Sequence, residues 1–187
     1  NYKFFTFAQV APDLKYRTLT VNGVSKSYCM TGWRIGYAAG PEKLIKAMIK
    51  IQGQSTSNPS SISQHAAMAG IGGSKDFLKP CLDAFDKRRH FVVNKLNSIP
   101  GINCIMPKGA FYAYPNVEGL LGKKTKDGKI LNNDSEVVEW LLDEAEVAAV
   151  PGAAFGLEPY FRVSYATSLD LLKEAMDRIE RAVLSLS

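Results

Sequence analysis

Residues 25–37 read Ser-Lys-Ser-Tyr-Cys-Met-Thr-Gly-Trp-Arg-Ile-Gly-Tyr and follow a β-rich stretch that ends at a tight turn. Lys26 lies among small and apolar residues, and its nearest basic neighbour is Arg34. A buried lysine has a lowered pKa and can attack a carbonyl carbon, whereas the planar fork of an arginine suits a phosphate dianion. The pair describes a ligand with an aldehyde and a phosphate, such as pyridoxal phosphate. A solvated surface lysine is the alternative.

The composition is that of an ordinary folded protein. The 187 residues are 46% hydrophobic and 22% charged, and no apolar run approaches the ~18 residues that indicate a membrane-spanning helix. The net charge of +5 is spread along the chain, and its densest basic cluster surrounds the turn pair Asp127-Gly128. That cluster consists of Lys123, Lys124, Lys126 and Lys129. We interpret it as a solvated turn and predict no nucleic-acid partner and no membrane partner.

The cysteines favour a reducing compartment. Cys29, Cys81 and Cys104 are odd in number and widely spaced, so they predict neither a disulfide framework nor a zinc site. We therefore expect no bound metal and a cytoplasmic location.

Hydrophobic periodicity predicts an α/β segment followed by a small α+β segment. Strands are predicted over 17–21, 34–39, 103–106, 110–114, 147–150 and 160–165. Helices are predicted over 41–53, 62–71, 75–97 and 133–145, and after the cap Ser168. These elements predict an α/β piece over 1–73, a long connecting helix within 74–100 and a small α+β domain over 101–187. Two strands are too few for an independent sheet in the first piece, which indicates further sequence upstream.

The motif around Lys26 resembles a known family. Ser25-Lys26 with Gly32, Arg34 and Gly36 is similar to the lysine-attachment motif of fold-type I, class I pyridoxal-phosphate aminotransferases. The sequence of residues 21–41 resembles that of the bacterial aspartate aminotransferases. Further segments resemble family segments in the same order, so the resemblance covers essentially the whole chain. They are 48–61, 107–112, 151–156 and 161–168.

The resemblance implies a fold and three site residues. The fold would be the end of the large pyridoxal-phosphate-binding α/β domain, followed by the small α+β C-terminal domain. Lys26 would be the Schiff-base lysine, which later moves a proton between the substrate Cα and the cofactor. Arg34 would bind the cofactor phosphate, and Arg162 would hold the substrate α-carboxylate through two parallel hydrogen bonds. The implied reaction is transamination of L-aspartate with 2-oxoglutarate by a homodimer.

The chain also departs from this family by omission. Complete members are about twice as long and carry, ahead of the lysine, an aspartate for the pyridine nitrogen, a tyrosine for the ring oxygen and a helix N-terminus for the phosphate. The chain therefore resembles a carboxy-terminal half, and we expect it to be inactive in isolation.

The sequence leaves several alternatives open. The chain could be an inactive fragment or an interaction unit, or a lyase or decarboxylase on the same scaffold. The substrate could be prephenate or another amino acid. Arg162 could instead form a structural ion pair with Glu158, four residues earlier in the sequence.

Overall fold

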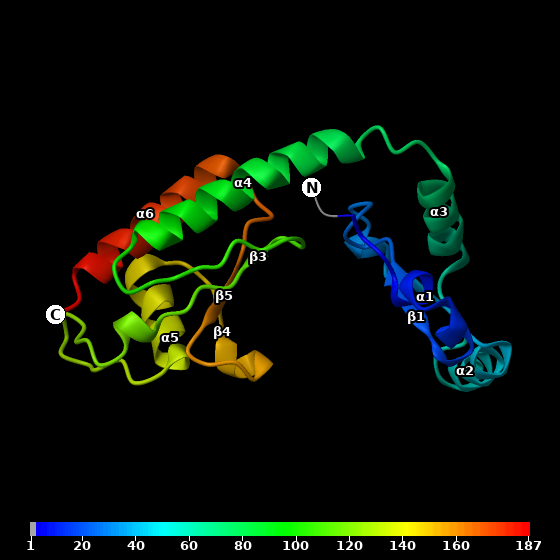
Figure 1. Cartoon of the computed structure of the whole chain (residues 1–187), viewed down its shortest axis with the longest axis horizontal. Coiled ribbons are helices and arrows are strands. Elements are labelled where there is room, and N and C mark those ends of the chain that lie inside the picture. Colours follow the sequence, from blue (N-terminus) through cyan, green and yellow to red (C-terminus); the bar gives the residue numbers. More distant parts are fainter. Residues whose placement is uncertain (1–2) are drawn as a thin grey trace. The chain divides into compact units, whose positions relative to one another are not determined.

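The structure, a computed structural model, describes residues 3–187, and the chain divides into two compact units. The first unit ends at Lys79, and the second begins at Pro80. Each unit has its own sheet and its own buried cluster (Figure 1).

The first unit is built on a two-stranded antiparallel ribbon. Its elements are α1 (Phe7–Val10), the 3-10 helix η1 (Pro12–Arg17), β1 (Thr20–Gly23), the 3-10 turn η2 (Thr31–Trp33), β2 (Gly36–Ala39), α2 (Glu42–Ser55) and α3 (Ser61–Gly72). Both strands begin later than predicted. Pro12 starts a 3-10 helix because its fixed φ suits a first helical position. The second strand is delayed because Arg34 adopts a left-handed conformation with φ 48°.

The first unit buries little apolar surface. Among the described residues, its buried hydrophobic side chains are Val24, Met30 and Ala67. Ile49 and Ile51 on α2 remain 62% and 71% exposed. Within the described chain, α2 therefore has an uncovered apolar surface.

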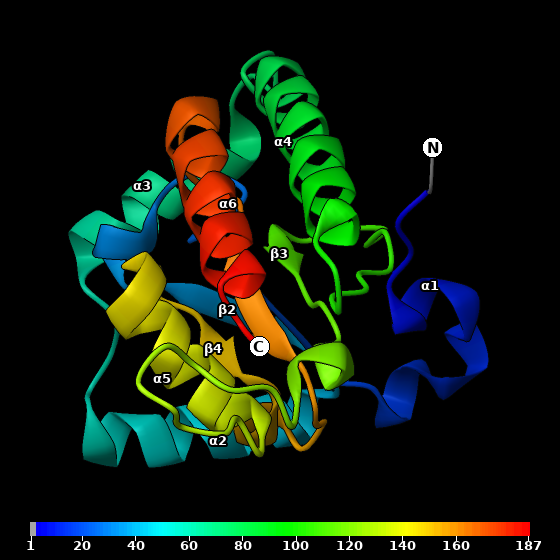
Figure 2. The ribbon, with the colours of Figure 1, turned by 90° about the vertical axis from the view of Figure 1, so that its left-hand side faces the viewer.

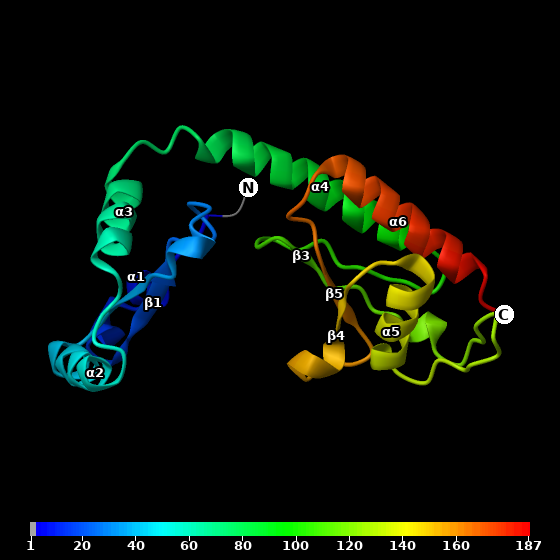
Figure 3. The same cartoon turned by 180° about the vertical axis from the view of Figure 1, so that it is seen from behind.

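The second unit combines three helices with a three-stranded antiparallel sheet. Its elements are α4 (Leu78–Ser98), β3 (Tyr112–Ala113), η3 (Glu118–Leu120), α5 (Asp134–Ala145), β4 (Val150–Pro151), η4 (Gly152–Phe155), β5 (Phe161–Ser164) and α6 (Leu169–Leu184). The strand order is β3-β5-β4. The helices α4 and α6 run side by side in Figures 1 and 2, and Figure 3 shows both above the strands.

A continuous hydrophobic core holds the second unit together. Leu96 on α4 and Met176 and Ile179 on α6 are fully buried, and each contributes about 1.5–3 kcal/mol. At the surface of this contact, Lys95 Nζ lies 2.7 Å from a Glu180 oxygen. No helix within residues 3–187 is both long and apolar enough to cross a lipid bilayer.

The strand predicted over 103–106 is wrong. Asn103 forms a single bridge with Asn116, and no ladder continues from it. The Asn97 side chain instead accepts a hydrogen bond from Cys104 N at 2.7 Å and donates one to Cys104 O at 2.9 Å. The Asn97 side chain thus forms hydrogen bonds with the backbone N and O of Cys104, which a neighbouring strand would need.

Side-chain caps start the last two long helices, and the one at Ser168 is the predicted cap. Asn133 accepts a hydrogen bond from Glu136 N at 2.9 Å, and Ser168 accepts one from Leu171 N at 3.3 Å. In a capping box, the Glu136 carboxylate would accept from the N–H of the cap residue Asn133, but here it accepts from Asn132 N, one residue earlier.

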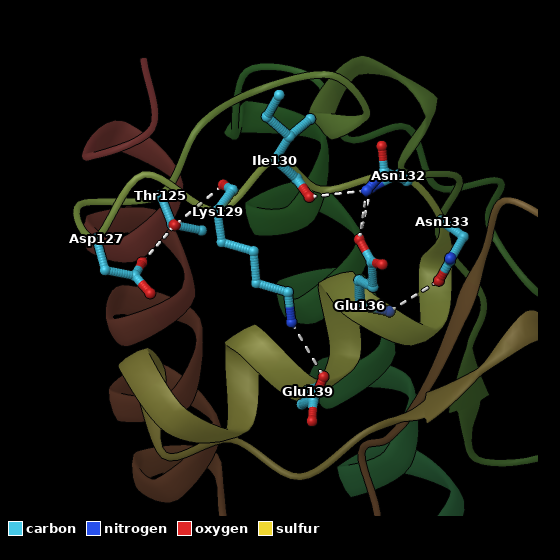
Figure 4. A network of polar contacts seen from close by, with 8 residues as sticks. All are labelled: Thr125, Asp127, Lys129, Ile130, Asn132, Asn133, Glu136 and Glu139. Atoms are coloured by element: carbon cyan, nitrogen blue, oxygen red, sulfur yellow. Dashed lines mark hydrogen bonds and ion pairs between the residues drawn. The ribbon is translucent and has the colours of Figure 1, made fainter.

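The lysine-rich loop before α5 is exposed at Lys124, Lys126 and Lys129, as expected of a solvated turn, and polar contacts also tie it down (Figure 4). The Thr125 hydroxyl donates to Asp127 at 2.5 Å, and Lys129 Nζ lies 3.2 Å from Glu139 on α5. Asn132 donates to Glu136 from its backbone N at 2.8 Å and from its side chain at 3.0 Å. The loop is therefore fixed against the start and the outer face of α5.

We expect the Glu136 carboxyl to titrate below its ordinary pKa of 4.5, because the backbone and the side chain of Asn132 donate to its charged form. Its contribution to stability is then present above pH 4.5 and is lost as the pH falls through the lower folded-state pKa. NMR titration of the Glu136 carboxyl carbon measures this pKa. Asn132→Ala should move the pKa part of the way back, whereas the control Asn94→Ala on α4 should not. A Glu136 pKa at or above 4.5 would contradict the prediction.

Candidate active site

Lys26 lies in a compact turn between β1 and η2. The turn is closed by hydrogen bonds from Tyr28 N to Val24 O at 3.1 Å and from Met30 N to Ser25 O at 3.1 Å. Val24 and Met30 are buried at its two ends and pack with Ala67 of α3. The buried ends hold the turn on α3, so the position of the Lys26 backbone is fixed.

The Lys26 side chain itself is exposed. Within residues 3–187 the side chain is therefore that of a solvated surface lysine, the alternative given above, and it is not buried. No hydrogen bond or ion pair engages its amine in that range, so the nitrogen is available to a ligand. Cys29, in the same turn, adopts a left-handed conformation with φ 54°, which is uncommon for a residue with a side chain.

Arg34 follows η2 at the point where the chain turns into β2. Its left-handed backbone directs the chain into the ribbon, and its Nη1 donates to Thr31 O at 2.8 Å. A glycine suits position 36 of the ribbon, because a Cβ there would lie 3.1 Å from Asn22 O, which is tighter than an ordinary contact. A Cβ at Gly32 would meet nothing within 4 Å, so the other side of Arg34 is open.

The charges of this segment fit an anionic aldehyde. The sequence contains no Asp or Glu between Val24 and Tyr37. In the described chain, neither Lys26 nor Arg34 has a carboxylate partner. A lysine amine suits a carbonyl carbon and an arginine suits a phosphate, so these residues fit pyridoxal phosphate.

Arg162 lies in the second unit, at the middle of β5 and opposite Val150 of β4. Its guanidinium carbon lies 4.4 Å from the centre of the Tyr112 ring and 4.6 Å from that of the Phe155 ring. Within residues 3–187, no carboxylate forms an ion pair with it, so the alternative pairing with Glu158 is not observed. The Arg162 guanidinium is therefore available to a ligand, and its role in binding a substrate carboxylate stays a prediction.

A family model described as "Aminotransferase class I and II" matches residues 3–179. The chain belongs to this family. The match confirms the family that was predicted from the Lys26 motif. Members of this family are pyridoxal-phosphate-dependent enzymes.

Relatives of this aminotransferase family match the whole chain. It is 56% identical over 187 residues to an aspartate aminotransferase of Rhizobium meliloti strain 1021. It is 54% identical over 187 residues to a probable aspartate/prephenate aminotransferase of Rickettsia felis. In both cases the chain spans 46% of the relative's length.

Solved aminotransferase structures have the same fold. The crystal structure of the aspartate aminotransferase from Rhizobium meliloti superposes with a TM-score of 0.96 at 55% identity, covering 100% of this chain and 46% of that one. An aspartate aminotransferase from Thermus thermophilus with maleate gives 0.83 at 34% identity, covering 97% and 44%. The predicted fold class is confirmed: the chain matches one part of the fold-type I aminotransferase fold, with mixed helix and sheet content.

The sequence did not single out Phe155 or Asp134. Phe155 is one aromatic residue in a glycine-rich loop, and no periodicity marks it. Asp134 has the pattern of an ordinary acidic residue in a first helical turn, yet it is fully buried. Of the other aromatic residues near the motifs, Tyr165 belongs to the core, where its hydroxyl donates to Ala110 O at 3.0 Å.

Proposed function

We propose that the protein catalyses transamination of L-aspartate with 2-oxoglutarate, with Lys26, Arg34 and Arg162 as site residues contributed by this chain. The observation that carries the proposal is that neither Lys26 nor Arg34 has a carboxylate partner among the described residues, in a chain 56% identical over its length to a bacterial aspartate aminotransferase. The products are oxaloacetate and glutamate. The remaining groups of the site would come from outside these 187 residues.

Each residue type suits its proposed role. When bound, pyridoxal phosphate supplies an electron sink that makes the substrate Cα proton acidic. The Lys26 amine would hold the cofactor and, once free, would accept and return the Cα proton of the substrate. Arg34 binds the phosphate and keeps its charge throughout, because an arginine does not lose its proton in proteins. Arg162 binds the α-carboxylate and orients the substrate.

Prephenate is a second candidate amino acceptor. The observation in its favour is that relatives 54% and 52% identical to this chain are named for both aspartate and prephenate. Steady-state assays with aspartate as donor, and with 2-oxoglutarate or prephenate as acceptor, separate the two possibilities.

The activity is tested with the protein expressed from its complete gene and loaded with pyridoxal phosphate. We expect turnover of aspartate and 2-oxoglutarate at rates ordinary for enzymes, about 1–10³ per second. The 187-residue chain alone should show little or no turnover. A complete protein that binds the cofactor but transaminates no amino acid would overturn the proposal, and decarboxylation or elimination products would favour a lyase.

We further propose that the complete enzyme is a cytoplasmic homodimer. The exposed apolar residues of α2 and α3, such as Ile51 and Ile62 at 71% each, are consistent with burial against further protein. The free cysteines are consistent with a reducing compartment. Sedimentation at micromolar concentration should give twice the protomer mass. A monomer over that range would contradict the proposal.

A further inference from the structure

Asp134 is a fully buried carboxylate that none of the roles above uses. It is the first residue of α5, and its Oδ2 accepts hydrogen bonds from Ala153 N and Tyr160 N at 3.2 Å each. The Ser135 hydroxyl lies 3.5 Å from its Oδ1 and completes its set of donors. A buried carboxylate needs such donors, and the positive end of α5 adds to them. Asp134 therefore ties the start of α5 to backbone that lies 19 and 26 residues further along the chain.

These hydrogen bonds fix one closed loop, residues 152–160. Gly152 N donates to Tyr160 O at 2.7 Å, and Leu157 N donates to Gly152 O at 3.1 Å. A Cβ at Gly152 would lie 2.0 Å from Leu157 O and 3.0 Å from the Asp134 carboxylate, so the closure needs a glycine there. The 152–160 loop is thus held at both ends and cannot shift without breaking contacts to Asp134.

The same loop carries an aromatic ring to Arg162. Phe155 places its ring centre 4.6 Å from the guanidinium carbon. Within residues 3–187 the guanidinium has no hydrogen-bond acceptor and no carboxylate, so the rings of Phe155 and Tyr112 are its contacts. A guanidinium held by ring faces takes its position from those rings.

Tyr114 contacts two aromatic residues of the 152–160 loop, Tyr160 and Phe155. Its ring stacks on Tyr160 with centres 5.3 Å apart and meets Phe155 edge-on at 6.2 Å. Burial raises the pKa of the Tyr114 hydroxyl, the Asp134 charge raises it further, and the Arg162 charge opposes both. Asp134 and Arg162 therefore act on the same tyrosine.

We propose that Asp134 is a positioning residue for Arg162: its buried carboxylate holds the 152–160 loop, and that loop keeps the Phe155 ring against the guanidinium. The inference rests on the proposed role of Arg162 as the ligand of the substrate carboxylate. Because Asp134 acts on the orientation of a binding group, its loss weakens substrate binding more than it slows the chemical step.

Kinetics of the complete enzyme test this role. Asp134→Ala should raise KM for both the amino acid and the oxo acid by about tenfold, and change kcat by less than about threefold. Asp134→Asn retains an oxygen that can accept from Ala153 N and Tyr160 N, so its KM should stay within about threefold of wild type. The control Asp143→Asn, exposed in the last turn of the same helix, should leave both parameters unchanged.

A double-mutant cycle separates positioning from a general structural role. In an Arg162→Lys background, the effect of Asp134→Ala on KM should fall below about twofold, because both changes act through one contact. Equal effects in both backgrounds, or a loss of kcat with unchanged KM, would overturn the inference. If Asp134→Ala does not fold, Phe155→Ala removes the ring from a half-exposed site, and it should raise KM by at least about fivefold. An unchanged KM in that variant would equally overturn the inference.

Crystal structures of the variants keep this test independent of the activity. If the wild-type enzyme transaminates nothing, the proposed function fails, but the positioning role is still decided. Asp134→Ala should displace the Phe155 ring and the Arg162 guanidinium by about 1 Å or more, and Asp143→Asn should not. A guanidinium that stays in place in Asp134→Ala would overturn the inference whatever the activity.

Discussion

Replacement of Lys26 by alanine is expected to lower kcat/KM for aspartate by at least ~10⁴-fold. The variant loses both the covalent attachment of the cofactor and the base that moves the Cα proton. Arg34 remains, so the cofactor should still bind through its phosphate. Steady-state kinetics with aspartate and 2-oxoglutarate measure the loss, and visible absorbance measures cofactor retention.

The attachment point is checked separately with borohydride. Reduction should link the cofactor covalently to the wild-type protein but not to Lys26→Ala. Lys43→Ala on α2 is the matched control, because that lysine is also exposed and forms no ion pair within residues 3–187. It should retain both linkage and turnover. A cofactor that is still trapped in Lys26→Ala would identify another lysine as the attachment point.

Arg162→Lys is expected to raise the activation free energy in kcat/KM by about 2–4 kcal/mol. Lysine keeps the charge but loses the planar fork, so one charge-assisted hydrogen bond to the carboxylate disappears. The loss should occur with both the amino acid and the oxo acid, because both carry that carboxylate. Cofactor content and the thermal unfolding midpoint should change little.

Arg88→Lys provides the matched control for this experiment. Arg88 also lies over an aromatic ring, with its guanidinium carbon 5.3 Å from the centre of Phe85, but it is outside the proposed site. It should leave both half-reactions unchanged. If kcat/KM is unchanged in Arg162→Lys as well, Arg162 is a structural residue and not a substrate ligand.

The sequence could predict the site segments because their signals are local. The spacing of Lys26, Arg34 and the flanking glycines is contained in thirteen residues, 25–37. The caps Asn133 and Ser168 depend on bonds to residues three positions away, so the helix starts were also predictable. These features can be recognised without knowing which distant residues contact them in the folded chain.

Features that depend on distant contacts could not be predicted in this way. The exposure of Lys26 depends on which other segments pack over its turn. The residues next to Lys26 in the sequence do not determine that packing. The surroundings of Arg162 come from Tyr112 and Phe155, which reach it from a neighbouring strand and from the loop before β5. Asp134 is marked only by its burial, which arises when α5 meets a loop 19 residues downstream.

The closed geometry at Gly152 has a consequence for directed evolution of substrate range. Any side chain at that position collides with backbone, which cannot rotate away, so randomising it fills a library with misfolded clones. Phe155 is half exposed and Tyr112 is only partly buried, so exchange at either position should leave the fold intact while it changes the contacts of Arg162. A selection for new carboxylate substrates therefore keeps codon 152 constant and diversifies codons 112 and 155.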